Sequence, residues 1–255
     1  TIVAAIAIYA TISAGYQAAL MAPTEILATQ HAEKLAKVFA GTHVHVGLLT
    51  GSLTAKQHRE LVGAIKKGDI NLIIGTHALI QSDVEYANLG LVITDEQHRF
   101  GVNQRQQLRE KGEHPDVLAM TATPIPRTLA ITSYGEMDVS VIDKLPAGRK
   151  PIETRWLKDK QSNDALKFLR QQLASGAQAY VVSPLIEESE ALDVQNATDL
   201  YERLANYFQP DYQVGLLHGR LNGGKKDAVM KDFQDGKIQV LGSTTVVEVG
   251  VDNPN

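Results

Sequence analysis

The stretch LVITDEQH, residues Leu91 to His98, carries a run of aliphatic residues directly into two carboxylates, an amide and an imidazole. A short apolar run of this kind is typical of a buried strand. In an open parallel sheet, ligands bind outside the carboxyl ends of the strands, so Asp95 and Glu96 would lie at that edge. Asp95 could hold Mg²⁺, directly or through water, because hard cations prefer carboxylate oxygens. Glu96 could orient or deprotonate a water molecule in line with a phosphorus atom, and His98 could sense the state of that site.

A structural explanation of the same motif stays open, because an Asp that follows a strand often caps the next helix. The next apolar run, residues 116–120, also ends in polar residues, with Thr121 and Thr123 on either side of an alanine. These hydroxyls would lie at the same sheet edge, within reach of His98 or Glu96. A Thr-rich turn broken by prolines is the competing interpretation.

Two further apolar runs end in similar chemistry. Pro23 and Thr24 follow one of them, and Gly75 and Thr76 follow another. A hydroxyl beside a helix N-terminus suits phosphate, since the first N–H groups of a helix are exposed donors. Taken singly, each pair is also explained as an ordinary helix cap.

The apolar runs alternate with helical patterns along the chain. Strands are expected at residues 17–21, 45–49, 71–74, 91–94 and 116–120, and helices at residues 25–39 and 55–67. On the first of these helices we expect one shared face made of Leu27, His31, Leu35, Val38 and Phe39. Alternating aliphatic strands and helices predict an α/β fold with a parallel sheet covered on both faces.

The alternation pauses at residues 143–151, DKLPAGRKP, whose two prolines and glycine mark a candidate linker. It then restarts, with strands expected at residues 179–183, 213–217 and 239–242 and helices at residues 164–174, 197–208 and 223–234. This pattern predicts a second α/β unit. Thr244 and Thr245 follow its last strand, where hydroxyls suit the backbone phosphates of a polymer. We find no fixed-period repeat.

The composition is that of a globular protein: 44% of the 255 residues are hydrophobic. There is no cysteine, which excludes disulfides and Cys-ligated zinc and fits a reducing compartment. The net charge of -4 means that any site for a polyanion must be local. Residues 2–14 are almost wholly apolar but too short to span a bilayer, and they lack the basic leader of a signal peptide. We therefore expect a helix there that is buried on all sides, and no membrane partner.

Taken together, these motifs resemble those of superfamily two helicases, and closely those of the bacterial ATP-dependent DNA branch-migration helicases within it. The resemblance covers essentially the whole chain. The stretches that carry it are APTEILATQH from Ala22, GTHALIQ from Gly75, DEQHRFGVNQR from Asp95, TATPIPRTLA from Thr121, SPLIEESE from Ser183, LHGRL from Leu217 and STTVVEVGVD from Ser243.

The resemblance implies two RecA-like lobes, residues 1–145 and 146–255, each a mainly parallel sheet with helices on both faces and each incomplete at its chain end. It implies ATP and Mg²⁺ as cofactors. Asp95 and Glu96 match the pair that serves the magnesium ion and the hydrolytic water. His98 matches the residue that couples the ATP state to two threonines, here Thr121 and Thr123.

The same resemblance implies further binding residues. Thr1 matches the last threonine of a phosphate loop, and Gly250 and Asp252 fall in a motif at the cleft between the lobes. Arg127 is a further basic candidate for nucleic acid, with a plainer role as a charge at a helix start. The positions that match a nucleic-acid track are Pro23, Thr24, Gly75, Thr76, Thr244 and Thr245.

The implied parent protein is an ATP-dependent helicase that remodels branched double-stranded DNA, such as stalled forks and Holliday junctions, in recombination and repair. We expect it to be a cytoplasmic monomer. The phosphate loop and the distal arginine motif of such proteins do not occur within the 255 residues, so we expect these residues alone not to hydrolyse ATP. Gly242 and Asn253 stand where aliphatic residues are expected and could loosen the local packing.

A different class of function remains as the alternative. The chain could be a phosphate-binding module or a small-molecule ATPase with no nucleic-acid substrate. Its mildly acidic charge and its aromatic content of 5% favour this alternative weakly.

Overall fold

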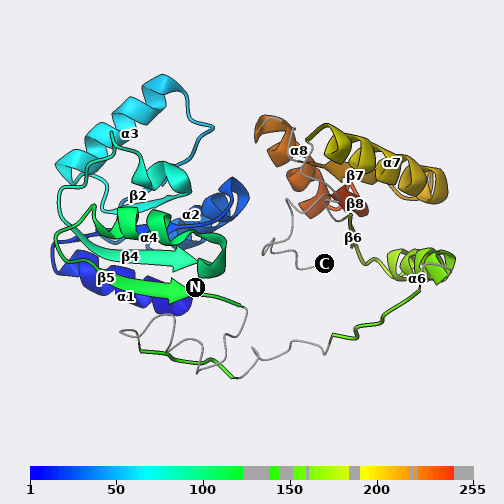
Figure 1. Cartoon of the computed structure of the whole chain (residues 1–255), viewed down its shortest axis with the longest axis horizontal. Coiled ribbons are helices and arrows are strands. Elements are labelled where there is room, and N and C mark those ends of the chain that lie inside the picture. The colour runs from blue at the N-terminus through cyan, green and yellow to red at the C-terminus, as the bar shows by residue number, and fades with distance from the viewer. Residues whose placement is uncertain are drawn as a thin grey trace. The chain divides into compact units, whose positions relative to one another are not determined.

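β4 (Leu89–Asp95) lies inside a five-stranded parallel sheet, between β1 (Gln17–Met21) and β5 (Asp116–Met120). β3 (Leu72–Gly75) and β2 (Val46–Leu49) continue the sheet beyond β1, in the order β2-β3-β1-β4-β5. Figure 1 labels β2, β4 and β5 of this sheet. Four consecutive residues of β4 are buried, which explains why its sequence is a continuous aliphatic run and not an alternation. The expected parallel sheet is confirmed.

The structure is a computed structural model. It divides the chain into two compact units, Thr1–Ser140 and Val141–Asn255, and the five-stranded sheet belongs to the first. The expected boundary between residues 145 and 146 lies outside the described residues and stays a prediction. The structure describes residues 1–122, 138–143, 152–158, 161–183, 190–218, 221 and 223–243.

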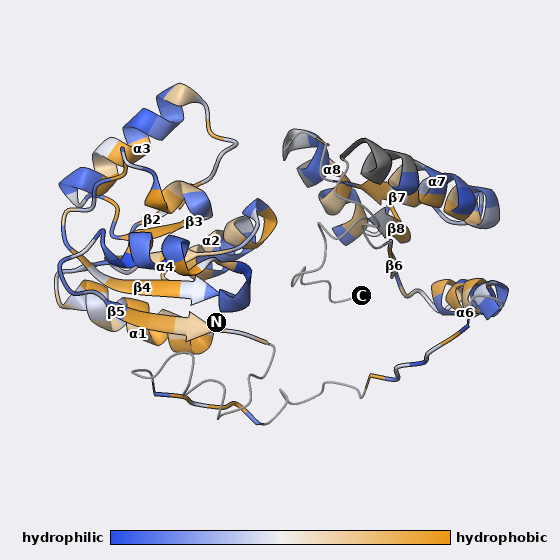
Figure 2. Cartoon of the chain, viewed as in Figure 1, coloured by the Kyte–Doolittle hydropathy of each residue, from blue (hydrophilic) through white to orange (hydrophobic). Residues whose placement is uncertain are grey.

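Helices cover both faces of the sheet in the first unit. α3 (Ala55–Lys67), α4 (Val102–Arg109) and the 3₁₀ turn η1 (His77–Ile80) pack on one face. α1 (Ile2–Ser13) and α2 (Glu25–Val38) lie on the other face, toward which alternate strand residues point. In Figure 2, β4 is hydrophobic along most of its length and turns hydrophilic at its C-terminal end, so the burial stops where the polar motif begins.

The prediction that the N-terminal helix is buried on all sides is wrong. α1 buries one stripe, made of Ala4, Ala5, Ile8 and Ile12, whereas Ile2 is 67% exposed and Ile6 is 66% exposed. An evenly apolar helix carries no sequence signal for which side meets the sheet, and its outer side here contacts little of the described chain. No helix within the described residues is both long enough and apolar enough to cross a membrane.

The expected apolar face of the second helix is right at four of its five positions. Leu27, His31, Leu35 and Phe39 are buried, but Val38 is 56% exposed. α2 ends at Val38, and this last residue lies off the stripe that faces the sheet. The alanines between the larger residues complete the stripe, which allows close approach of the helix to the strands.

Gln17, at the start of β1, ties three segments of the first unit together. Its Nε2 donates to the carbonyl of Ile65 at 2.9 Å and to that of Ile70 at 2.7 Å. Its Oε1 accepts from the backbone N–H of Asn88 at 3.0 Å. The side chain is buried, so each of these bonds replaces contacts with water that the segments have lost.

The second unit is a smaller parallel sheet. Its strands are β6 (Ala179–Val182), β7 (Val214–Leu217) and β8 (Val240–Ser243), in the order β6-β8-β7. Its helices are α6 (Ser162–Ala174), α7 (Glu190–Phe208) and α8 (Gly223–Gln234), so the expected helix at residues 197–208 begins earlier, at Glu190.

Gly242, in β8, does not loosen this second sheet. A Cβ atom placed on it would lie 3.3 Å from Cδ1 of Leu204 and 3.6 Å from the carbonyl oxygen of Gly215. The side chain of Leu204 from α7 therefore fills the space that an aliphatic residue would need.

One supersecondary unit occurs in both halves of the chain, although the sequence shows no fixed-period repeat. β2 and β7 have the same sequence, VGLL, and pair in the same register, Val46 with Leu72 and Val214 with Val240. Gln178 matches Gln17, because its Nε2 donates to the carbonyls of Phe233 and Ile238 at 2.5 and 2.7 Å. The two sheets are therefore built on the same local plan.

Replacement of Gln17 by alanine is expected to lower the free energy of unfolding by about 1–3 kcal/mol, because two carbonyls and one N–H, all at least partly buried, lose their partner. Chemical denaturation of the Gln17→Ala chain measures this loss. Gln107→Ala, at an exposed position of α4, is the matched control and should change stability by less than about 0.5 kcal/mol. Equal stabilities of the two variants would contradict the role given to Gln17.

Candidate active site

The polar motif begins where β4 leaves the sheet. Asp95 is the last residue of β4, and Glu96 follows it with φ 52° and ψ 54°, in the left-handed region. Among the described residues, Glu96 is the only non-glycine residue with positive φ. Such a conformation costs about 1–3 kcal/mol and persists only where the surrounding structure imposes it, which is common at functional sites. The turn leads into a 3₁₀ segment, η2 (Gln97–Arg99).

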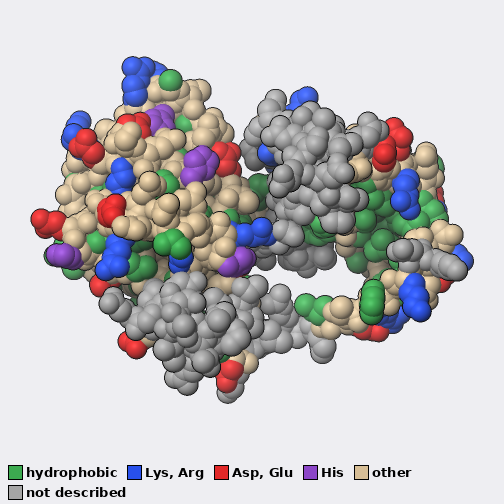
Figure 3. All heavy atoms as spheres, in the orientation of Figure 1, with side chains coloured by type: hydrophobic (Ala, Val, Ile, Leu, Met, Phe, Trp, Pro, Cys, Tyr) green, Lys and Arg blue, Asp and Glu red, His purple; other side chains and the backbone are tan. Residues whose placement is uncertain are grey.

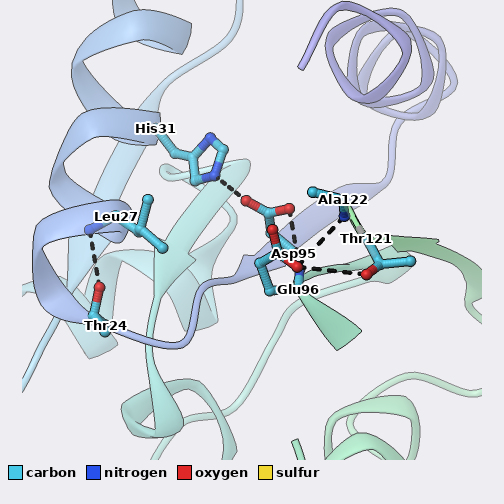
Figure 4. A network of polar contacts seen from close by, with 7 residues as sticks. All are labelled: Thr24, Leu27, His31, Asp95, Glu96, Thr121 and Ala122. Carbon is cyan, nitrogen blue, oxygen red and sulfur yellow. Dashed lines mark hydrogen bonds and ion pairs between the residues drawn. The ribbon is translucent and has the colours of Figure 1, made fainter. Parts of the chain in front are cut away.

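The carboxylate of Glu96 meets residues from the neighbouring strand end. Its Oε2 accepts from the hydroxyl of Thr121 at 3.4 Å and from the backbone N–H of Ala122 at 3.5 Å (Figure 4). The same oxygen lies 3.5 Å from Nδ1 of His98, and that nitrogen lies 3.5 Å from the hydroxyl of Thr121. The structure thus brings together Glu96, His98 and Thr121. The contacts are long, so they place the groups side by side without locking them.

The carboxylate of Asp95 has a different set of partners. Its Oδ2 accepts from Nε2 of His31 at 2.7 Å, and its Oδ1 accepts from the backbone N–H of Glu96 at 3.1 Å. The helix cap at Glu96 makes no side-chain hydrogen bond. Asp95 is therefore not a helix cap here, and its orientation is set by α2 and by the turn that follows β4.

His31 is the residue of this site that sequence reasoning missed. The sequence placed it on the apolar face of α2, and the structure confirms that it is 9% exposed there. A buried imidazole on an apolar face needs a polar partner, which was the available signal. The sequence could not say which partner, because Asp95 lies 64 residues away along the chain.

The strand ends predicted to meet nucleic acid differ in what they expose. The hydroxyl of Thr24 accepts from the backbone N–H of Leu27 at 3.3 Å and so caps α2, and Pro23 beside it is half-buried. Packing alone explains why residue 75 is a glycine, since a Cβ atom there would lie 2.2 Å from the carbonyl oxygen of Leu49. Thr76 is 3% exposed, and its hydroxyl is buried without a hydrogen-bond partner. A ligand at this edge would therefore reach Thr24 more readily than the side chain of Thr76.

Several predicted site residues lie outside the described part of the chain. They are Thr123, Arg127, Thr244, Thr245, Gly250 and Asp252. Thr1, by contrast, is described: it is exposed and stands just before α1 with no side-chain cap hydrogen bond.

A loop that the sequence analysis passed over lies at the same edge of the sheet. Thr50 follows β2 and is buried, and its hydroxyl lies 2.9 Å from that of Ser52. It occupies the position that His218 occupies after β7 in the second unit. The repeated VGLL sequence was the signal that could have found it.

The sequence of the chain matches a known class of protein. Residues 1–131 match the family described as DEAD/DEAH box helicase, and residues 162–255 match the helicase conserved C-terminal domain. The chain belongs to the DEAD/DEAH box helicase family. Its two parallel sheets are those of RecA-like helicase lobes.

More specific similarity is to the ATP-dependent DNA helicase RecG. The chain is 59% identical over its whole length to RecG of Streptococcus pneumoniae and 58% identical to RecG of Bacillus subtilis. It spans 38% and 37% of the lengths of these two curated relatives. A solved structure of RecG bound to a three-way DNA junction matches with a TM-score of 0.74 and 43% identity, over 100% of this chain and 33% of that one.

A more distant structure shares the fold alone. Dbp5 of S. cerevisiae, bound to RNA and ADP BeF3, matches 94% of this chain and 60% of its own with a TM-score of 0.67 and 17% identity.

The backbone strain at Glu96 can be tested separately from the loss of its carboxylate. Glu96→Gly and Glu96→Ala both remove the carboxylate, but only glycine adopts positive φ without strain. We expect the glycine variant to be more stable by roughly 0.5–1 kcal/mol, since relief of left-handed strain exceeds the extra unfolded-state entropy of glycine. Chemical denaturation of the two chains measures the difference.

Gln107 in α4 supplies the control pair. Glycine is unfavourable inside a helix, so Gln107→Gly should be less stable than Gln107→Ala by about 0.5–1 kcal/mol. The same order of stability at both positions would show that the turn at Glu96 is not strained.

Proposed function

We propose that the chain is the motor core of an ATP-dependent DNA helicase that remodels branched double-stranded DNA, such as stalled forks and Holliday junctions, in recombination and repair. One observation carries the proposal: Asp95 and Glu96 lie together at the end of β4, with Thr121 of the neighbouring strand end against Glu96. Its support from relatives is the similarity to RecG proteins, one of which was solved on a three-way DNA junction.

The cofactors in this proposal are ATP and Mg²⁺. Magnesium is usually held by one or two carboxylates together with substrate phosphates, and Asp95 offers such a carboxylate at the end of β4. Asp95 would hold the ion, directly or through water, with its orientation set by His31. The ion would neutralise charge on the phosphates.

In the proposed reaction, Glu96 orients the attacking water and accepts its proton. Its carboxylate lies against His98, the hydroxyl of Thr121 and a backbone N–H, which are the groups expected to respond when nucleotide binds. Thr123 would act with Thr121. Thr1, Gly250 and Asp252 would contact the nucleotide.

The DNA is proposed to follow a local track and not a broadly basic face. In the view of Figure 3, Lys and Arg are interspersed with Asp and Glu over the first unit. Phosphate contacts would come from hydroxyls, backbone N–H groups and helix N-termini, with Arg127 as a basic contact. The proposed track residues are Pro23, Thr24, Gly75, Thr76, Thr244 and Thr245. We further propose that the parent acts as a cytoplasmic monomer.

The catalytic assignment is tested with Glu96→Gln in the full-length protein. Because glutamine cannot accept the proton of the attacking water, the variant should lose at least about 10²-fold in ATP hydrolysis while it still binds nucleotide. ATP turnover is measured with and without forked duplex, beside equilibrium binding of a nucleotide analogue. Wild-type turnover that ignored forked duplex would refute the DNA-driven motor.

The polymer substrate is tested by salt. Contact with several DNA phosphates predicts a steep fall in affinity as salt rises, with a slope that grows by about 0.9 for each phosphate neutralised on duplex DNA. Binding of forked duplex between low and physiological salt measures this slope. A flat response would favour the phosphate-binding module without a polymer substrate.

Residues 1–255 alone are expected to show no measurable ATP turnover. The distal arginine motif does not occur within the 255 residues, and arginine contacts of that kind contribute about 10³–10⁵ in rate at related phosphoryl-transfer sites. A phosphate-release assay on the chain itself, beside the full-length protein, measures this difference. Robust DNA-stimulated hydrolysis by the chain alone would contradict the expectation.

A further inference from the structure

His31 joins two parts of the first unit that have separate proposed tasks. At one end of the link, its Nε2 donates to Oδ2 of Asp95 at 2.7 Å, as Figure 4 shows. At the other end, α2 begins after Thr24, seven residues earlier in the chain. Seven residues are nearly two helical turns, or about 10 Å along the axis. A single helix thus runs from a proposed DNA contact to the proposed magnesium carboxylate.

We propose that His31 is a positioning residue that couples DNA at the N-terminus of α2 to the magnesium-bound nucleotide at Asp95. This inference rests on the proposed function and deepens it. It assigns to His31 a role in binding, not a part in the bond-breaking step.

The contact fixes the carboxylate of Asp95. Oδ2 is held by His31 and Oδ1 by the backbone N–H of Glu96, so both oxygens have a defined direction, while each keeps a lone pair for a further partner. Side-chain hydrogen bonds of this kind orient metal ligands, and their loss typically costs 10–100-fold in metal affinity. Without the imidazole, the carboxylate would rely on one bond from its neighbouring residue.

α2 is suited to transmit a displacement. Its inner stripe is closely packed, with Ala28 and Leu35 at 0% exposure on either side of His31. Its N-terminus is closed by the hydroxyl of Thr24, which accepts from Leu27 and retains its own proton to donate to a phosphate. A ligand that shifts or steadies this end of the helix therefore shifts or steadies His31. The 2.7 Å contact between His31 Nε2 and Asp95 Oδ2 passes this change on to Asp95.

Thermodynamic linkage makes the coupling measurable in both directions. If DNA tightens nucleotide binding by some factor, nucleotide must tighten DNA binding by the same factor. Such factors are typically about 5–150-fold. Replacement of a residue that carries the coupling should lower both affinity factors, whereas replacement of a residue that only packs should lower neither.

The experiment measures the affinity of the full-length protein for a non-hydrolysable ATP analogue as a function of Mg²⁺ concentration, with and without forked duplex. Two variants of similar volume are compared. His31→Leu keeps the packing but has no donor, and His31→Gln keeps an N–H donor near the position of Nε2. Leu35→Val, one turn further along the same buried stripe, is the control for lost packing.

His31→Leu is expected to raise the Mg²⁺ concentration needed for half-maximal analogue binding by roughly tenfold or more. The factor by which DNA tightens analogue binding should fall close to one in this variant. His31→Gln should retain most of both properties, and Leu35→Val should resemble wild type. Wild-type behaviour of His31→Leu would overturn the proposal. Equal losses in His31→Leu, His31→Gln and Leu35→Val would overturn it too, by reducing the effect to packing.

The result for wild type separates this inference from the proposed function. If DNA leaves analogue binding by the wild-type protein unchanged, there is no coupling for His31 to carry and this inference fails, while the motor is still judged by whether ATP turnover responds to forked duplex. If DNA tightens binding by wild type and equally by His31→Leu, the motor stands and only the role of His31 is refuted.

Discussion

The parallel pairing of β4 with β5 is the constraint on which the site depends. Their register places Asp95 opposite Met120, the last residue of β5, so both strands leave the sheet at the same level. The next residues along the chain, Glu96 on one side and Thr121 on the other, therefore meet across neighbouring strand ends. A slip of one residue would exchange the faces to which side chains point and would bring Thr121 to a different neighbour.

The two carboxylates of this edge are held by different means, which suits different tasks. Asp95 remains in the sheet and accepts hydrogen bonds of 2.7 Å from the buried His31 and 3.1 Å from the backbone N–H of Glu96. Glu96 lies beyond the sheet on a strained turn, and its partners stand at 3.4–3.5 Å. A group held by a 2.7 Å hydrogen bond suits a metal ligand, whereas a group whose contacts are 3.4–3.5 Å long can adjust when a reactant arrives. Adjacent residues thus differ in freedom because one is paired in the ladder and the other is not.

Predictions from the sequence succeeded where the signal is local. Apolar runs identified all the strands of the described chain to within two residues at each end. The runs are clearest in β1, β3 and β4, because these strands are buried on both faces. The prediction for α1 failed because its sequence is apolar on every side, so that only the position of the sheet decides that Ile8 is inside and Ile6 outside. The prediction that Val38 is buried was wrong for a related reason: the hydrophobic period says least about the last turn of a helix.

For the candidate site, the sequence by itself determined which chemical groups stand at the ends of which strands, and the family match over residues 1–131 includes the strand ends of the first sheet. The tertiary structure alone decided which of these groups meet. It brought Thr121 to Glu96, buried the hydroxyl of Thr76, and gave Asp95 its partner on α2. The physical reason is range: strand and helix patterns arise from neighbours along the chain, whereas a hydrogen bond between residues 31 and 95 exists only once the helix has packed on the sheet.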